Sequence, residues 1–412
     1  GRWAIDAERL RRARAQGMEF VVIVETWLGG GTKRAIDDIG SLVGYRGRVE
    51  MRLRSLRSGA IQLSCPALPL SAVFGDDDVW PLLAMLNAAE VSLVMVHQLL
   101  GFSKTTIDAL TTWCRPRNSI AYIHDFYSIC PRVTLIDAVG TYCGIKSADV
   151  CDRCVGLGGG HEASRLNELS VGEHRTLLGD FLGAMRTVVA PSDDAARHVA
   201  SVYPGLAIRA IPHPELRDDI DQPGDRSNMS NIILLGGIGP HKGSEKLLEI
   251  ARLARLTHPH LTFSVIGHTD IDDALEAVGN VRISGQYKKS ELRTLLDQER
   301  GRIALFLHIW PETYSYTLSE ALNAGLLPLV PDIGAPAERI RLHSQGLVFD
   351  FPIQAANVLR IIDSAVESRE VERPDPLTRH QQSSIRTLDA LVNSSSQLSA
   401  SARLEDSLDT SR

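Results

Sequence analysis

The chain has 412 residues, of which 44% are hydrophobic and 23% charged, and its formal net charge is −6. This length predicts two domains, each large enough to bury its own core. The acidic balance argues against a nucleic-acid partner, which would favour a basic stripe. No apolar run reaches the roughly 18 residues that a membrane span needs.

The N-terminal segment over residues 1–19 carries one basic cluster, made of Arg9, Arg11, Arg12 and Arg14. A solvated helix face explains such a cluster, and peripheral contact with an anionic membrane is the alternative. No secretory signal peptide is recognisable. We therefore expect a cytoplasmic protein, with the inner face of the membrane as a second location.

Short β-branched runs alternate with helical patterns from residue 20 onward, which is typical of parallel α/β sheets. A stretch rich in Pro, Asp, Gly and Ser interrupts the alternation, and its composition predicts a linker over 213–230. We therefore expect two Rossmann-like domains, 20–212 and 231–366, whose strand ends face a central cleft. The predicted strands are 20–25, 91–96, 120–124, 188–190 and 207–211 before the linker, and 232–235, 261–266, 281–284, 303–308 and 326–330 after it.

The end of the chain, over residues 367–412, is polar and rich in serine. This composition predicts a largely disordered tail. Residues 384–392 (SIRTLDALV) are predicted to form a helix that docks before the tail.

Two glycine-rich turns follow predicted strands and precede predicted helices. The first contains Gly29, Gly30, Gly31 and Thr32, and the second runs from Gly236 to Lys242. Glycine lets backbone N–H groups approach a ligand closely, and a helix N-terminus favours an anion. A lysine at such a turn suits a diphosphate, although plain turns and a solvated lysine are the alternatives. The second turn is not a P-loop, because Gly follows Lys242.

Two acids, Glu312 and Glu320, stand eight positions apart around a predicted helix start. Glu312 follows a predicted strand, so we expect it on a loop that faces the cleft. As alternatives, Glu312 is an ordinary loop acid and Glu320 completes a capping box with Thr317. A glycosidase carboxylate pair is a third interpretation.

The segment from Glu312 to Glu320 with the following "ALNAGLLPLVPDIGAPAERI" resembles the E-x7-E donor-site signature of family 4 retaining glycosyltransferases of the GT-B fold. Three further segments resemble that family in the same order: "VVIVETWLGGGTKRAIDDI", "VVAPSDDAARHVASVYP" and "GGIGPHKGSEKLLEIARLA". Together they cover most of residues 20–366. The resemblance is to the bacterial polysaccharide type with a cysteine-containing insertion.

The resemblance implies roles for individual residues. Glu312 contacts the donor sugar, Glu320 holds the nucleotide ribose, and Lys242 binds the diphosphate and offsets charge on the leaving group. His124, in "YIHDFYSICPR", lies by the reacting sugar. No metal is required for catalysis. Where the family usually has an arginine before the lysine, this chain has Gly237. The implied donor-binding set also includes Gly239, His241, Tyr314, Ser315, Tyr316 and Thr317, and Gly29 to Thr32 form the acceptor-side loop.

Four of the six cysteines gather in the predicted loop 127–160 with the spacing C-x12-C-x7-C-x2-C. This spacing predicts a structural zinc site, while free cysteines, a disulfide or an iron–sulfur cluster are the alternatives. The ligands would be Cys130, Cys143, Cys151 and Cys154. A D-x-D pattern at 76–78 is better explained as a helix start than as a second metal motif.

These observations together predict a retaining glycosyltransferase that moves a sugar from a nucleotide-sugar to a carbohydrate or lipid-linked acceptor, in polysaccharide or O-antigen synthesis. A non-catalytic carbohydrate-binding or assembly module of the same fold is one alternative. A nucleotide-sugar epimerase is another. The sugar, the nucleobase, the acceptor, the linkage and the oligomeric state are not encoded in any pattern that we recognise.

Overall fold

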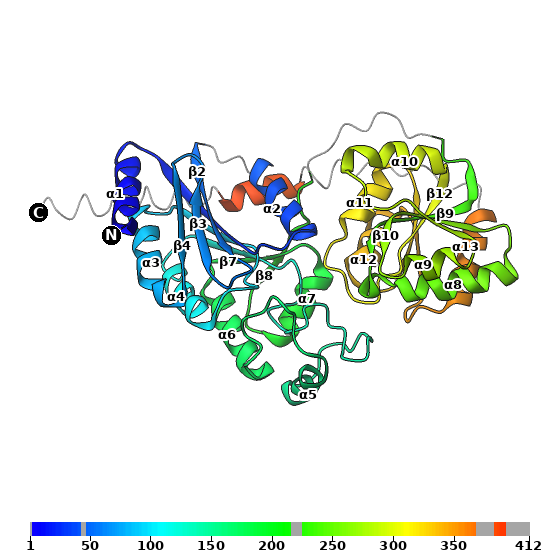
Figure 1. The fold of residues 1–412 in the computed structure, drawn as a ribbon, viewed down its shortest axis with the longest axis horizontal. Helices are drawn as coiled ribbons and strands as arrows, with labels where there is room; N and C mark the ends of the chain where they lie inside the picture. The colour runs from blue at the N-terminus through cyan, green and yellow to red at the C-terminus, as the bar shows by residue number, and fades with distance from the viewer. Residues whose placement is uncertain (1, 43–46, 216–224, 368–382, 393–412) are drawn as a thin grey trace, which may run out of the picture.

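The computed structural model describes residues 2–42, 47–215, 225–367 and 383–392, which form two lobes (Figure 1). Each lobe is built on its own sheet, of eight strands in the N-terminal lobe and six in the C-terminal lobe. The predicted α/β class with two Rossmann-like domains is therefore confirmed. Within the described residues, no helix combines the length and the apolar character that crossing a bilayer demands.

The N-terminal sheet has the strand order β4-β3-β2-β1-β5-β6-β7-β8, in which β1, β2 and β5 to β8 are parallel. Its strands are β1 (Glu19–Glu25), β2 (Arg48–Ser55), β3 (Ile61–Cys65), β4 (Leu70–Phe74), β5 (Leu93–Val96), β6 (Ser119–Tyr122), β7 (Thr187–Ala190) and β8 (Ile208–Ala210). Its helices are α1 (Arg2–Ala15), α2 (Gly31–Leu42), α3 (Val79–Ala88), α4 (Lys104–Cys114), α5 (Ala148–Gly158), α6 (Val171–Ala184) and α7 (Asp193–Val202).

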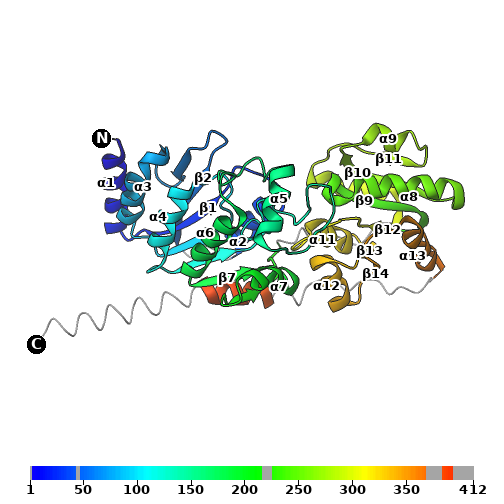
Figure 2. The same ribbon diagram turned by 90° about the horizontal axis from the view of Figure 1, so that it is seen from below.

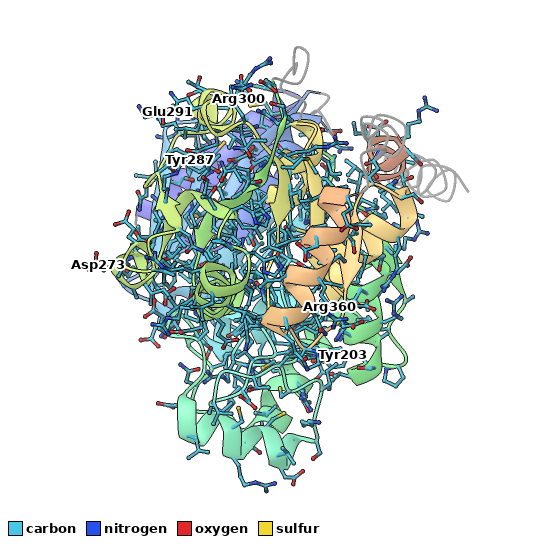
Figure 3. The ribbon with its side chains drawn as sticks, turned by 90° about the vertical axis from the view of Figure 1, so that its right-hand side faces the viewer. Tyr203, Asp273, Tyr287, Glu291, Arg300 and Arg360 are labelled. Atoms are coloured by element: carbon cyan, nitrogen blue, oxygen red, sulfur yellow. The ribbon has the colours of Figure 1, made fainter. Side chains whose placement is uncertain are left out.

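The C-terminal sheet is parallel throughout, with the order β11-β10-β9-β12-β13-β14. Figure 3 views this lobe end-on, with Arg360 on its last helix. The strands are β9 (Asn228–Ile238), β10 (Thr262–Thr269), β11 (Val281–Ile283), β12 (Gly301–Leu305), β13 (Leu327–Pro331) and β14 (Leu347–Phe349). The helices are α8 (Ser244–Thr257), α9 (Asp272–Glu276), α10 (Leu292–Glu299), α11 (Tyr316–Asn323), α12 (Gly334–His343) and α13 (Ala355–Glu367).

The predicted strands all correspond to strands of the two sheets, but four observed strands were missed. The central strand β1 is apolar along its length because helices cover both faces of a parallel sheet. By contrast, β2 reads RVEMRLRS and β3 alternates buried with half-buried residues. These strands, together with β4 and β14, lack the continuous apolar runs on which the prediction relied.

The proposed domain boundaries remain a prediction. The C-terminal sheet starts at Asn228, inside the predicted 213–230 linker, and residues 216–224 lie outside the described part of the chain. Of the predicted polar tail, residues 368–382 and 393–412 also lie outside the described part.

The predicted helix near the C-terminus is present over residues 383–392. It docks on the N-terminal lobe, beside α2 and β7 in Figures 1 and 2. Leu388 is 1% exposed and Val392 is 2% exposed, and both pack against β1, β5, β6 and β7 residues. The helix over residues 383–392 therefore completes the core of the first lobe.

The four arginines of the predicted basic cluster lie on α1 and all face acids of the same lobe. Arg9 pairs with Asp6 at 3.1 Å, and Arg14 pairs with Glu90 at 3.2 Å. Arg11 and Arg12 both pair with Glu8. This pattern agrees with the solvated-face interpretation, and membrane contact stays a prediction.

We predict that Leu388→Ala lowers the free energy of unfolding by about 2–5 kcal/mol, because it leaves a cavity under the docked helix. Leu256→Ala is the matched control, since Leu256 is 81% exposed. Urea unfolding followed by tryptophan fluorescence compares the two variants. Equal midpoints would show that residues 383–392 do not stabilise the lobe.

Candidate active site

The C-terminal sheet reverses its winding between β9 and β12. The connection after β9 leads to β10 on one side, and the connection after β12 leads to β13 on the other. Ligands of open α/β sheets bind outside the carboxyl ends of the strands at such a switch point. The two segments that leave these strand ends are the 239–243 turn and the 306–315 loop.

Lys242 and Glu312, one from each of these segments, lie together. Lys242 Nζ is 3.8 Å from Glu312 Oε1, and Glu312 is only 6% exposed. Burial alone would raise the pKa of Glu312. The charge of Lys242, the nearby His308 and a hydrogen bond from Ser315 outweigh burial and hold this pKa below its ordinary value. The carboxylate is therefore ionised at neutral pH.

Close backbone approaches set the positions of both segments. Gly243 has a φ of +80°, and a Cβ there would lie 2.1 Å from the Leu307 carbonyl oxygen. Gly334, at the start of α12, has a φ of +73°, and its Cβ would lie 2.7 Å from the Glu312 nitrogen. Glycine is required at both positions, because any larger residue would push the strand ends apart.

The start of α11 lies between the two segments. Ser315 precedes the helix with a φ of +72° and gives it no side-chain cap. The first N–H groups of the helix therefore lack the usual side-chain acceptor. Gly236, on β9, faces Thr317 with 3.2 Å from a built Cβ to the threonine methyl group. A helix start beside a lysine is suited to holding an anion.

Glu320 lies on α11 and forms an ion pair with the other lobe. Its Oε1 accepts a hydrogen bond from Arg34 Nη1 at 2.5 Å. Burial raises the pKa of Glu320, and the charge of Arg34 partly opposes the shift. The capping-box interpretation is wrong, because α11 begins at Tyr316 and Glu320 lies beyond its first turn.

His124 lies at the lobe boundary, but both of its ring nitrogens already have partners. Its Nε2 is 2.9 Å from His97 Nδ1, and its Nδ1 is 3.3 Å from His213 Nε2. Burial lowers the pKa of His124 to about 3, so the imidazole is neutral. Its backbone carbonyl accepts a hydrogen bond from Thr313 Oγ1 at 2.6 Å. Thr313, which follows Glu312 in the chain, therefore contacts His124. Both ring nitrogens of His124 already have partners, so neither is left for a ligand.

The remaining predicted residues divide between the two lobes. A Cβ atom added to Gly31 would lie 3.5 Å from the Tyr316 ring, so the 29–32 loop reaches α11. Gly237 faces His268 of the neighbouring strand, and Gly239 faces His241. Tyr314 is buried beneath the loop instead of lining a surface.

The sequence analysis did not identify Glu215 and Arg339, whose side chains form hydrogen bonds with residues of the 306–315 loop. Tyr314 Oη donates to Glu215 Oε1 at 2.6 Å, and Ser319 Oγ donates to the same oxygen at 2.5 Å. Arg339 Nη1 donates to the carbonyls of Tyr314 and Ser315 at 3.0 and 2.9 Å. Glu215 stands in a segment that was interpreted as linker, and Arg339 lies within an ordinary helical pattern, so neither gave a signal.

The four predicted zinc ligands, Cys130, Cys143, Cys151 and Cys154, are free thiols. Cys143 Sγ donates to two backbone carbonyl oxygens at 3.2 and 3.1 Å. Burial and the neighbouring thiols raise the pKa of Cys143 to about 11, which favours its protonated form. Across the residues that the structure describes, no group of three or more His, Cys, Asp or Glu side chains is arranged to hold a metal ion. The structure therefore does not support the zinc prediction.

The comparison with protein families decides the class of this site. Residues 217–380, which contain both Lys242 and Glu312, match the family described as Glycosyl transferases group 1. Over these residues the chain is therefore similar to the glycosyl transferases group 1. No curated protein sequence matches it significantly.

Solved glycosyltransferase structures share the two-lobed GT-B fold of this chain. HepE of Anabaena, in complex with UDP-glucose, is 14% identical with a TM-score of 0.54, covering 93% of this chain and 100% of HepE. Sucrose-phosphate synthase from Thermosynechococcus elongatus is 12% identical with a TM-score of 0.56, covering 94% and 100%. A glycosyltransferase from Rickettsia africae is 13% identical with a TM-score of 0.56, covering 92% and 97%.

We predict that Gly334→Ala lowers the free energy of unfolding by about 1–3 kcal/mol, because the added methyl group collides with the Glu312 main chain. Gly183→Ala is the control, since nothing lies within 4 Å of its built Cβ. Chemical unfolding measures both. A Gly334→Ala protein as stable as the control would contradict the close approach.

Proposed function

We propose that the protein transfers a hexosyl group from a nucleotide-sugar to a carbohydrate or lipid-linked acceptor and retains the anomeric configuration. The observation that carries the proposal is the pairing of Lys242 with Glu312 at 3.8 Å at the switch point of the C-terminal sheet. In this pair, Lys242 is a cation that can bind a diphosphate, and Glu312 is a buried carboxylate that can bind a sugar. The structure of HepE with UDP-glucose makes that donor the first to test.

Lys242 and the start of α11 are the proposed diphosphate site. The N–H groups before the first turn of α11 carry a partial positive charge, and Lys242 adds a full one. Charge accumulates on the diphosphate as its bond to the sugar breaks. Groups that are already oriented toward that charge stabilise the transition state more than the ground state.

Glu312 and Glu320 are the proposed sugar and ribose ligands. Glu312 is ionised and buried, so it can accept hydrogen bonds from sugar hydroxyl groups and can stabilise positive charge that develops on the anomeric carbon. Glu320 has a carboxylate of the right type for two ribose hydroxyl donors. In the structure, Glu320 Oε1 accepts its hydrogen bond from Arg34.

We propose that the transfer step is a front-face substitution. The acceptor hydroxyl oxygen forms a bond to the anomeric carbon on the side from which the β-phosphate oxygen departs. The bond between the anomeric carbon and that phosphate oxygen breaks, and the acceptor proton moves to the departing diphosphate. We propose that the acceptor binds beside the 29–32 loop and His124, since both lie at the lobe boundary. A role in polysaccharide or O-antigen synthesis at the inner membrane face completes the proposal.

We predict that Glu312→Gln and Lys242→Met each lower the turnover number by about 100-fold or more, the loss typical when one preorganised electrostatic contact is removed. The measurement is release of nucleoside diphosphate from a panel of nucleotide-sugars and acceptors, with the product anomer assigned by NMR. Glu249→Gln is the control, because Glu249 is exposed on α8 and pairs only locally with Lys246.

Four outcomes would contradict the proposal. Full activity of both variants would remove the two side chains from the site. An inverted product would exclude the front-face substitution. Inertness of the wild-type protein with every donor would favour a binding module, and an epimerised free nucleotide-sugar would favour an epimerase.

A further inference from the structure

Arg34 lies where the two lobes meet, in the first turn of α2. Besides its 2.5 Å hydrogen bond to Glu320, its Nη2 is 4.0 Å from Glu215 Oε2. Its guanidinium carbon lies 4.4 Å from the centre of the Tyr316 ring. The side chain is 23% exposed, so it borders solvent. Arg34 is therefore a cation of the N-terminal lobe that contacts Glu320 and Tyr316, two proposed donor-binding residues of the C-terminal lobe.

The positive charges around the proposed donor site are already paired with acids, so they do not neutralise the added negative charge of a diphosphate. Lys242 already faces Glu312, and Arg34 faces three acids, Glu320, Glu215 and Asp38. Asp38 is 8% exposed and lies 3.8 Å from Arg34, so the acids around Arg34 are themselves largely buried. A nucleoside diphosphate therefore needs a second cation close to the start of α11.

Two guanidinium groups lie near that helix start, and they differ in how readily each can give up its present hydrogen bonds. Arg339 is 11% exposed and donates to two backbone carbonyl oxygens and to Ser319 Oγ. Moving it would strip buried backbone groups of their partners. Arg34 makes its one close hydrogen bond to a carboxylate oxygen that another donor can take over. Arg34 can exchange partners, and Arg339 cannot.

We propose that Arg34 is the second cation of the diphosphate site and that Glu320 holds it in place only while the site is empty. This inference rests on the donor site proposed above. Ribose hydroxyl groups replace the guanidinium on Glu320. The released guanidinium needs only a short movement to reach the diphosphate, because it already covers Tyr316, the first residue of α11. A guanidinium binds phosphate oxygens in a bidentate geometry.

The exchange links donor binding to the arrangement of the lobes. Lys242 belongs to the C-terminal lobe and Arg34 to the N-terminal lobe, so a diphosphate bound by both joins the two lobes. The existing contact of Gly31 with the Tyr316 ring, at 3.5 Å from a built Cβ, shows that the lobes already approach closely at this point.

The test separates the phosphates from the nucleoside. Wild-type protein is first titrated with UDP, GDP and ADP by calorimetry, and the diphosphate that binds is then compared with its own nucleoside. Arg34→Gln keeps a polar amide on a shorter side chain and removes the charge. We expect the Kd of the diphosphate to rise about tenfold or more, the loss typical of one charge-assisted hydrogen bond. We expect the Kd of the nucleoside to stay constant or to fall, because Arg34 no longer competes for Glu320.

Lys33→Gln is the matched control. Lys33 precedes Arg34 on the same helix, is 52% exposed and pairs with Asp37 at 2.9 Å. This variant removes the same charge from the same turn and should leave both Kd values unchanged. Arg34→Lys, which keeps the charge but loses the planar fork, serves if Arg34→Gln does not fold. It should weaken the diphosphate and not the nucleoside.

Each outcome leads to one conclusion. If the wild-type protein binds none of the diphosphates, the proposed function fails. If wild-type protein binds but Arg34→Gln leaves the diphosphate Kd unchanged, the inference is overturned and the proposed function stands. Equal weakening of diphosphate and nucleoside also overturns it, because it shows that Arg34 only holds the lobes together.

Discussion

Two opposite charges, those of Lys242 and Glu312, are held 3.8 Å apart at the end of a parallel sheet, and the proposed chemistry depends on that contact. Neither residue is near the other in sequence. The reversal of winding between β9 and β12 brings their segments to one crevice. Glycines at 243 and 334 allow the strand ends to approach closely enough. The site therefore follows from topology first and from side chains second.

The same loop that carries Glu312 also joins the lobes. Thr313 donates to the His124 carbonyl, and its own carbonyl accepts from Ser192 Oγ at 3.1 Å. Glu338, on α12 of the same lobe, makes a second connection: its carboxylate accepts from the backbone nitrogens at the start of α7, at 3.0 and 2.7 Å. Such a carboxylate at a helix N-terminus is favourable. A ligand that shifts the Glu312 loop must therefore act on both lobes, which is the physical basis for coupling between donor binding and lobe arrangement.

The sequence allowed prediction of the parts of this architecture that depend on local pattern. Apolar strand runs and the turns after them located Lys242 and Glu312 at strand ends, and strand ends in this fold meet. Side-chain pairing across the lobes was beyond reach, because no local pattern shows that Arg34 meets Glu320 or that His97 and His213 occupy both nitrogens of His124. The cysteine spacing predicted a zinc site from sequence distance alone. In the structure, the Cys143 thiol instead donates to backbone carbonyl oxygens.

The central claim is that the 239–243 turn and the 306–315 loop converge on one nucleotide-sugar. A crystal structure of the protein with its nucleotide-sugar donor, or with the matching diphosphate and sugar, tests it most directly. We expect a diphosphate oxygen about 3 Å from Lys242 Nζ and a sugar hydroxyl at a similar distance from a Glu312 oxygen. A donor that contacts only one of these side chains, or that binds away from the carboxyl ends of β9 and β12, would contradict the account.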